Sequence, residues 1–175
     1  MTPVHVDDYA VILEPLLGPG ERVVDVPGAS YVVGPETIED PADPEHATDT
    51  DRLRLVTRTL ARGEAVLGAK SSQAVTLRAA ILEEHLGGAD GDLVVTDRRL
   101  LVIDKPIAGA ALLWECPRTD IKVAKVTSGI GYAGRIVVVF SDGSSIALLL
   151  GILFKGHAVR LVAELNRDAD PALIE

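Results

Sequence analysis

Residues 91–104, with the sequence GDLVVTDRRLLVID, hold two apolar runs joined by a short polar turn. This pattern is typical of two antiparallel strands connected by a tight turn. Four further apolar runs follow at strand spacing: ALLWECP at 111–117, DIKVAKVT at 120–127, GRIVVVF at 134–140 and SSIALLL at 144–150. The segment 156–168, GHAVRLVAELNRD, then has the spacing of an amphipathic helix. Residues 91–167 therefore predict consecutive antiparallel strands closed by one helix.

Several of these strands are almost continuously apolar, as in IVVVF and IALLL. Strands of this kind are covered on both faces. The closing helix, with Val159, Val162 and Leu165 on one side, is expected to cover one face of the sheet. The other face requires either the segment 51–86 or a second copy of the chain.

The region before the strands predicts a helix and two short strands. Thr2 and Pro3 suit the start of a helix, and its apolar residues are Val6, Tyr9, Leu13 and Leu16. The runs ERVVDV at 21–26 and SYVV at 30–33 flank Pro27 and Gly28. They predict an edge hairpin or a bent strand that enters the sheet.

Residues 34–50 contain three prolines and six acidic residues. Such a segment buries little apolar area, so an acidic mobile loop is expected. Calcium binding is the alternative, but the ligand spacing of a calcium loop is missing. Residues 51–88 predict a helical insertion, because apolar residues recur at helical spacing until a pair of glycines. They are Leu53, Val56 and Leu60 in the first helix, and Val75, Leu77, Ile81, Leu82 and Leu86 in the second.

Composition narrows the class of protein. A chain of 175 residues with 47% hydrophobic residues suits a single domain spanning 1–175. Its net charge of −9 argues against nucleic-acid binding, which depends on Lys and Arg. Cys116 is the single cysteine, so an intramolecular disulfide is excluded and a reducing compartment fits. Without a basic leader or an apolar run of about 20 residues, a cytoplasmic protein with no transmembrane segment is expected.

Residues 91–167 resemble the bacterial pleckstrin-homology-like (PH-like) and GRAM-type domains. The resemblance rests on LVVTDRRLLVI at 93–103, the Trp114 strand, the strand pair RIVVVFSDGSSIAL and the terminal helix. LGPGERVV at 17–24 is also similar to the lead-in of such domains. The resemblance implies an α+β fold: a bent antiparallel β-sandwich or partly open barrel capped by a C-terminal α-helix. An N-terminal helix and the helical insertion would be additions to it.

Two glycine motifs have a structural and a functional interpretation. GIGYAG at 129–134 matches the dinucleotide-binding pattern, which requires a strand before it and a helix after it. Because strands are predicted on both sides, a hairpin loop is favoured. GEAVLGAKSS at 63–72 is one residue too long for a phosphate-binding loop and has no predicted strand before it, so an interhelical turn is favoured.

Arginines provide the candidate binding residues. Arg54, Arg58 and Arg62 recur every four residues and predict a ridge on one helix face that could contact an acidic partner or a lipid headgroup. Arg98 and Arg99 in the TDRR turn are the candidates in the strand region. Further basic residues there are Lys122, Lys125 and Arg135. For all of them a solvated surface role is the alternative.

Catalysis has no support in local motifs. The four histidines are scattered, Cys116 reads as a small core residue, and no nucleophile elbow is present. We therefore expect no catalytic residues, no metal and no cofactor. The favoured hypothesis is a non-enzymatic interaction or scaffold module that self-associates as a homo-oligomer or docks a protein partner. A peripheral membrane or phospholipid-binding module is the first alternative, and an enzyme built from sequence-distant residues is the weaker one.

Overall fold

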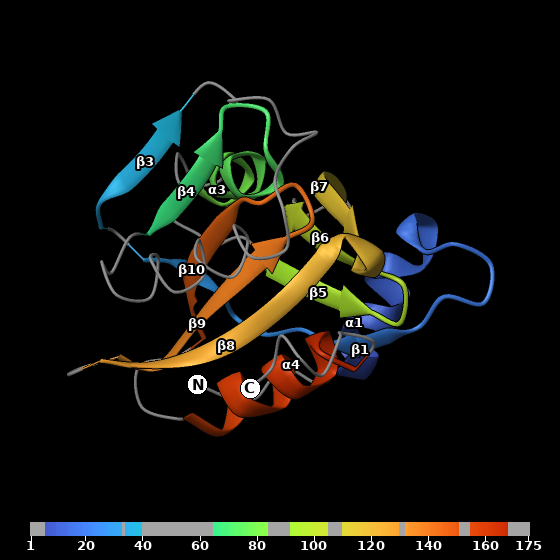
Figure 1. Cartoon of the computed structure of the whole chain (residues 1–175). Helices are drawn as coiled ribbons and strands as arrows, with labels where there is room; N and C mark the ends of the chain where they lie inside the picture. Colours follow the sequence, from blue (N-terminus) through green and yellow to red (C-terminus); the bar gives the residue numbers. More distant parts are fainter. Residues whose placement is uncertain are drawn as a thin grey trace.

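The computed structural model describes residues 6–32, 34–39, 65–83, 92–104, 110–129, 132–150 and 155–167. Over these residues the fold is mixed α+β with two β-sheets (Figure 1). Sheet A has the order β1-β5-β6-β7. Its strands are β1 (Val23–Asp25), β5 (Asp92–Thr96), β6 (Arg99–Asp104) and β7 (Ala111–Pro117).

Sheet B has the order β3-β4-β10-β9-β8, and β2 also pairs with β10. Its strands are β2 (Ser30–Tyr31), β3 (Glu36–Glu39), β4 (Val66–Ala69), β8 (Ile121–Gly129), β9 (Tyr132–Phe140) and β10 (Ser145–Leu149). The helices are α1 (Val6–Leu13), α3 (Gln73–Glu83) and α4 (Lys155–Leu165). Two short 3-10 helices are η1 (Glu14–Leu16), which follows α1, and η4 (Arg118–Asp120), which joins β7 to β8.

The predicted strands after Gly91 are confirmed. Strands β5, β6 and β7 form one antiparallel meander, and β8, β9 and β10 form another. The β9–β10 turn contains Gly143 at φ +83°, a conformation that glycine adopts without strain. The two meanders place all six strands in antiparallel neighbour pairs.

The segment between Val23 and Tyr31 contributes to both sheets. Val23 pairs with Thr96 of β5 in sheet A, whereas Tyr31 pairs with Leu148 of β10 in sheet B. Gly28 lies between the two pairings and forms an isolated bridge to Asp92. The bent strand expected from the sequence is therefore present, and it joins the two sheets along one side.

Two strands correct the sequence predictions. The acidic loop was expected to begin at residue 34, but Glu36–Glu39 forms β3. The segment 51–88 was expected to be helical, yet Val66–Ala69 forms β4, which pairs in parallel with β3 and antiparallel with β10. Sheet pairing overrides the weak local preference of these short runs. The predicted helix before residue 65 and the loop after residue 39 lie outside the described residues.

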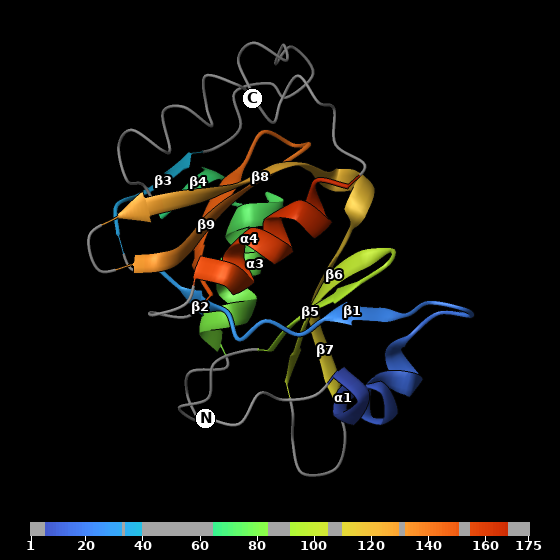
Figure 2. The ribbon, with the colours of Figure 1, turned by 90° about the horizontal axis from the view of Figure 1, so that it is seen from below.

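The main core lies between the two sheets, and α3 and α4 both contribute to it (Figure 2). From α3 it includes Leu77 and Ile81, and from α4 it includes Leu161 and Leu165. Trp114 and Phe140 meet edge to face in this core at a centroid distance of 6.3 Å. Because α3 packs against β4, β7 and β10, residues 73–83 cover strands of their own chain rather than those of a second copy.

The face of α4 that enters the core is close to the predicted one. Of the predicted residues, Leu165 is buried and Val162 is partly buried against the core. Val159 is instead exposed, and Ala158 and Leu161 complete the buried face. Ala158 carries little hydrophobic signal, so the sequence pattern did not indicate it.

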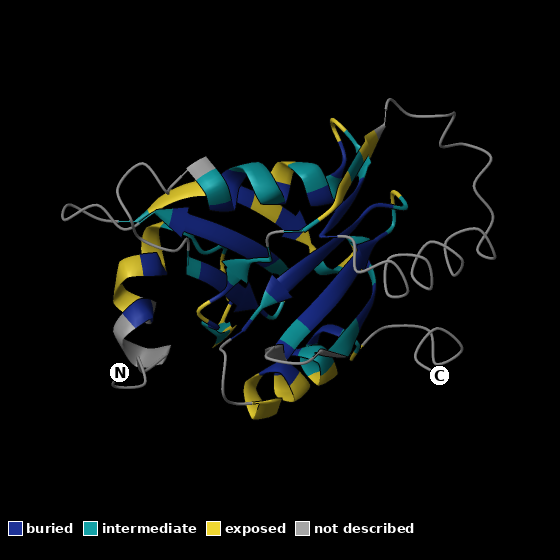
Figure 3. Cartoon of the chain, turned by 90° about the vertical axis from the view of Figure 1, so that its left-hand side faces the viewer, coloured by how far each residue is buried: buried dark blue, intermediate teal, exposed yellow. Residues whose placement is uncertain are grey.

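The outer faces of both sheets also bury apolar residues (Figure 3). On sheet A, α1 covers a second apolar cluster, which contains Tyr9, Leu13, Val94, Leu101 and Ile103. On sheet B a third cluster contains Val123, Val137, Val139 and Ala147. These sheet residues are not exposed while α1 covers sheet A, so association between copies in this state must use other side chains.

Candidate functional site

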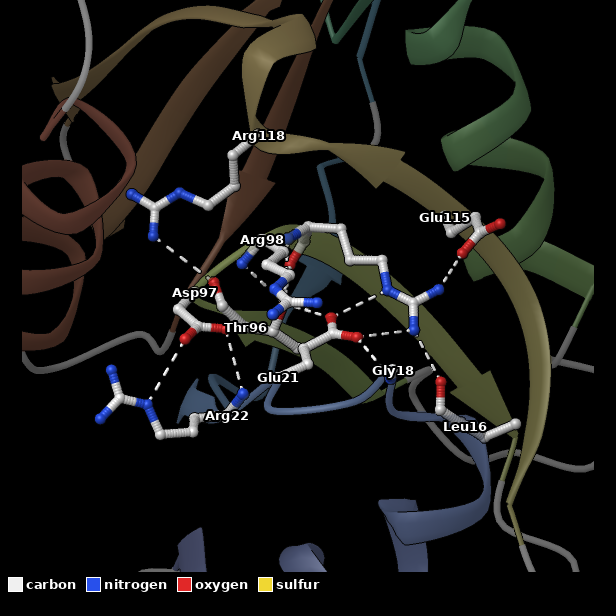
Figure 4. A network of polar contacts seen from close by, with 10 residues as sticks. Leu16, Gly18, Glu21, Arg22, Thr96, Asp97, Arg98, Glu115 and Arg118 are labelled. Carbon is white, nitrogen blue, oxygen red and sulfur yellow. Dashed lines mark hydrogen bonds and ion pairs between the residues drawn. The ribbon is translucent and has the colours of Figure 1, made fainter.

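The β5–β6 turn carries two of the arginines that the sequence singled out, amid a network of other polar residues (Figure 4). Arg98 and Arg99 follow each other in this turn, but their side chains have different surroundings. The helix ridge of Arg54, Arg58 and Arg62 lies outside the described residues. Its predicted role as a binding surface therefore stays a prediction.

Arg99 is held by two carboxylates and a backbone carbonyl. Its Nε donates to Glu21 Oε1 at 2.9 Å and its Nη2 donates to Glu21 Oε2 at 2.9 Å. Nη2 also donates to the Leu16 carbonyl at 2.6 Å, and Nη1 pairs with Glu115. A guanidinium with this many partners is part of the framework of the fold, and its binding of a ligand would require breaking these contacts.

Glu21 is the buried centre of this network, with a side chain only 2% exposed. Besides Arg99, its carboxylate accepts from the Thr96 hydroxyl at 2.7 Å and from the Gly18 N–H at 2.8 Å. Burial alone would raise the pKa of Glu21. The hydrogen bonds from Arg99, Thr96 and Gly18, together with the charge of Arg99, outweigh burial and lower the pKa from 4.5 to about 2.

Thr96 links this network to a second ion pair. Arg118 of η4 donates to Glu164 of α4 at 2.7 Å, and the same guanidinium donates to the Thr96 carbonyl at 3.4 Å. Arg118 also donates to the Glu164 carbonyl, and Glu164 pairs with Arg167. Thr96 thus contacts both ion pairs: its hydroxyl donates to Glu21 of the Glu21–Arg99 pair, and its carbonyl accepts from Arg118 of the Arg118–Glu164 pair.

The water-facing cations at this end are Arg22 and Arg98. The side chain of Arg22 is 82% exposed and pairs with Asp97 at 3.4 Å. Arg98 is exposed and lies beside the turn at residues 18–20, where a Cβ added to Gly20 would be 3.7 Å from its Nη2. The other basic candidates lie on β8 and β9 in sheet B, and they are Lys122, Lys125 and Arg135.

A second polar cluster was not anticipated from the sequence. Arg78 of α3 donates to Glu36 of β3 at 2.7 Å and lies over the Tyr31 ring, 5.5 Å from its centroid. The Tyr31 hydroxyl also donates to Glu36. Burial, and then the hydrogen bond to Glu36, raise the pKa of Tyr31 to about 12. This cluster joins α3 to two strands of sheet B. It could not be predicted from a local motif, because Arg78 is distant in sequence from Glu36 and Tyr31.

The two glycine motifs do not form nucleotide sites. Gly129 at the end of β8 pairs with Tyr132 at the start of β9, so GIGYAG connects two antiparallel strands as expected. The second motif was predicted to be an interhelical turn, but it runs from β4 into α3. Asp142 accepts from the Gln73 N–H at 2.7 Å at the start of that helix. A carboxylate therefore occupies the place where a phosphate would have to bind.

No cluster of three or more His, Cys, Asp or Glu side chains suited to a metal ion occurs in the described part of the chain. Cys116 is buried, as predicted, and burial raises the pKa of its thiol to about 12. A thiol in this state is a poor nucleophile. Within the same residues, no helix has the length and apolar character needed to cross a membrane.

Exposed apolar side chains provide a different kind of candidate site. We use the name α1–β7 surface for four residues: Val11, Ile12, Leu112 and Leu113. Val11 is 75% exposed, and the two leucines are each 40% exposed. Leu112 pairs across the strands with Ile103, which lies in the cluster beneath α1. Leu112 therefore lies on the outer side of sheet A beside the covered cluster, and Val11 and Ile12 lie on the helix that covers this cluster.

Comparison of the chain with protein-family models, with curated proteins and with solved structures finds no match.

Proposed function

We propose that this chain is a non-enzymatic interaction module with a PH-like arrangement, and that it self-associates through the α1–β7 surface. Three features support the PH-like arrangement. Two three-stranded meanders follow one another, a bent N-terminal segment pairs with both, and a helix follows the last strand. The buried thiol, and the absence of a metal-ligand cluster among the described residues, support a non-enzymatic role.

The observation that carries self-association is the exposure of the α1–β7 surface. Among the described residues β7 pairs with β6 alone, so it is an edge strand of sheet A. Glu115 and Pro117 protect its second half, because a charge and a proline both disfavour pairing with another strand. The first half, with Leu112 and Leu113, has neither a charge nor a proline, and its pairing with β6 shifts register between Leu112 and Trp114. Exposed apolar side chains on an edge strand favour contact with another chain.

A second copy fits this edge better than an unrelated strand. An antiparallel pairing of two β7 strands about a two-fold axis between Leu112 and Leu113 would place the leucines of the two copies opposite each other. Trp114 would then oppose Ala111, and both residues belong to the inner side of the sheet. Two-fold interfaces of this kind are the commonest in soluble homo-oligomers.

Light scattering coupled to size-exclusion chromatography tests the proposal. We expect a mass that rises from monomer to dimer with concentration, and a shift of the dissociation constant of at least about tenfold in a Leu112→Lys, Leu113→Lys variant. Val159→Lys is the matched control, because Val159 is exposed on α4, away from β7. A monomer at every concentration, or equal effects of the two variants, would contradict the proposal.

Binding to an anionic surface is a second candidate, favoured by the exposure of Arg22, just before β1, and of Arg98 on the β5–β6 turn. Flotation with vesicles that contain anionic lipid at low salt tests it. We expect Arg22→Ala with Arg98→Ala to abolish flotation. Flotation that persists in this double variant would exclude the turn as the binding site.

A further inference from the structure

We propose that residues 6–16 form a releasable strap over an apolar helix-docking face of sheet A, that the Glu21–Arg99 ion pair is its latch, and that the open face accepts α1 of a second copy. The strap is α1 with η1. The docking face consists of Val94, Leu101 and Ile103. In the structure this chain's own α1 occupies the face, and so shows which kind of helix fits it.

The first argument is that the strap is separate from the main core. The described side chains that α1 buries include Tyr9 and Leu13, and both belong to the cluster on the outer face of sheet A. Among the side chains that the structure describes between residues 9 and 28, none belongs to the main core between the sheets. The apolar packing of the sandwich is therefore complete when the strap leaves, so opening can occur without global unfolding.

The second argument is the position of the latch. Arg99 donates to the Leu16 carbonyl at the end of the strap, and Glu21 accepts from the Gly18 N–H just beyond it. Between these contacts the chain turns through Gly18, Pro19 and Gly20, and Gly20 has φ +71°. The latch thus holds both sides of the turn about which the strap would swing.

The third argument is the nature of the face that opening uncovers. Val94, Leu101 and Ile103 are fully buried, and they are apolar neighbours on adjacent strands. They accept two side chains four residues apart, Tyr9 and Leu13, with the Tyr9 hydroxyl donating to Asp92 at 2.9 Å. A helix with this spacing from a second copy makes the same contacts.

The inference goes beyond the proposed function: α1 carries Val11 and Ile12 of the α1–β7 surface, so release of α1 would remove two of the four residues of that surface. The two proposals are nevertheless tested separately. Association is measured by light scattering. Strap opening is measured by hydrogen exchange within one chain, and it does not depend on association.

Hydrogen exchange is the first experiment. In the native protein we expect the amides of α1 to exchange at least about tenfold faster than those of β9, because they open without the sandwich. Glu21→Gln should speed exchange of the α1 amides by a further 10- to 100-fold, because it removes a buried ion pair. Exchange of the β9 amides should change much less. Glu14→Gln is the matched control, an exposed carboxylate on the strap.

A fluorescent peptide with the sequence of residues 1–17 is the second experiment. We expect it to bind the Glu21→Gln protein at least about tenfold more tightly than the native protein, whose own strap competes for the face. A peptide with Leu13→Asp should not bind. Equal acceleration of α1 and β9 by Glu21→Gln would overturn the releasable strap, and equal peptide binding by the two proteins would overturn the latched docking face.

Discussion

Helices α1 and α4 each cover part of a β-sheet, but they are attached in different ways. α4 inserts Leu161 and Leu165 into the main core, and its Glu164 is clamped by Arg118. α1 packs Tyr9 and Leu13 into a separate cluster, and the segment that follows it is clamped by the Glu21–Arg99 pair. The difference indicates that α4 shares the stability of the whole sandwich, whereas α1 depends on a local cluster and a polar latch.

Matched truncations of the two helices test this difference with the largest expected effect. Leu161 and Leu13 are both fully buried. Leu161→Ala should lower the free energy of unfolding by about 2–5 kcal/mol, measured by denaturant titration of the fluorescence of Trp114, which lies in the main core. Leu13→Ala should mainly accelerate hydrogen exchange in α1. Equal losses in the Trp114 titration would show that the two helices belong to one cooperative unit.

The pH dependence of the latch is the next test. Because the pKa of Glu21 is lowered in the folded state from 4.5 to about 2, its stabilising contribution is complete above pH 4.5 and is lost as the pH falls toward 2. Protection of the α1 amides relative to the β9 amides should therefore decrease across this range. In Glu21→Gln the ratio should be independent of pH there, and a ratio that falls equally in both proteins would assign the effect to other groups.

The C-terminal end of α4 offers a smaller, more local test. Asn166 accepts from the Ala124 N–H and donates to the Ala124 carbonyl, both at 2.8 Å. Asn166→Ala leaves these edge groups of β8 without their partner and should cost about 1–3 kcal/mol in the Trp114 titration. Arg167→Ala, which removes an exposed ion pair, should cost less than about 1 kcal/mol. A reversed order would mean that Asn166 does not anchor α4.

Two glycines provide the smallest test. Gly156 in α4 has open space where a Cβ would lie, so Gly156→Ala should stabilise the protein by about 0.4–1 kcal/mol. Gly20 has φ +71° in the turn after the strap, so Gly20→Ala should weaken α1 protection by about 1 kcal/mol. Hydrogen exchange resolves both changes. A change in α1 protection caused by Gly156→Ala would contradict the independence of the two helices.

The sequence was sufficient for the strands after Gly91 and for α4, because continuous Val, Ile and Leu runs separated by polar turns leave few alternatives. It was insufficient for β3 and β4. The run ETIE is acidic, and its Glu36 is paired with Arg78 of α3, far along the chain, and accepts a hydrogen bond from Tyr31 of β2. The run VLGA suggests a turn when taken alone, and it forms a strand because it pairs with β3 and β10 in sheet B.

The candidate site was predicted only in part, because its residues come from segments that are distant in sequence. The TDRR turn drew attention to Arg98 and Arg99, and the structure places both where the N-terminal segment meets sheet A. The partner of Arg99 could not be inferred, since Glu21 is distant in sequence and forms no local motif with it. Long-range pairing of two charges becomes visible only when the strands that carry them are placed side by side.

The bent segment from Val23 to Tyr31 has a consequence for how the chain is made. It leaves the ribosome well before β10, yet Tyr31 pairs with Leu148 of that strand. Contacts of such high sequence separation form late, because the loop between them must close first. During synthesis this segment has to wait for β10 before it can join sheet B to sheet A.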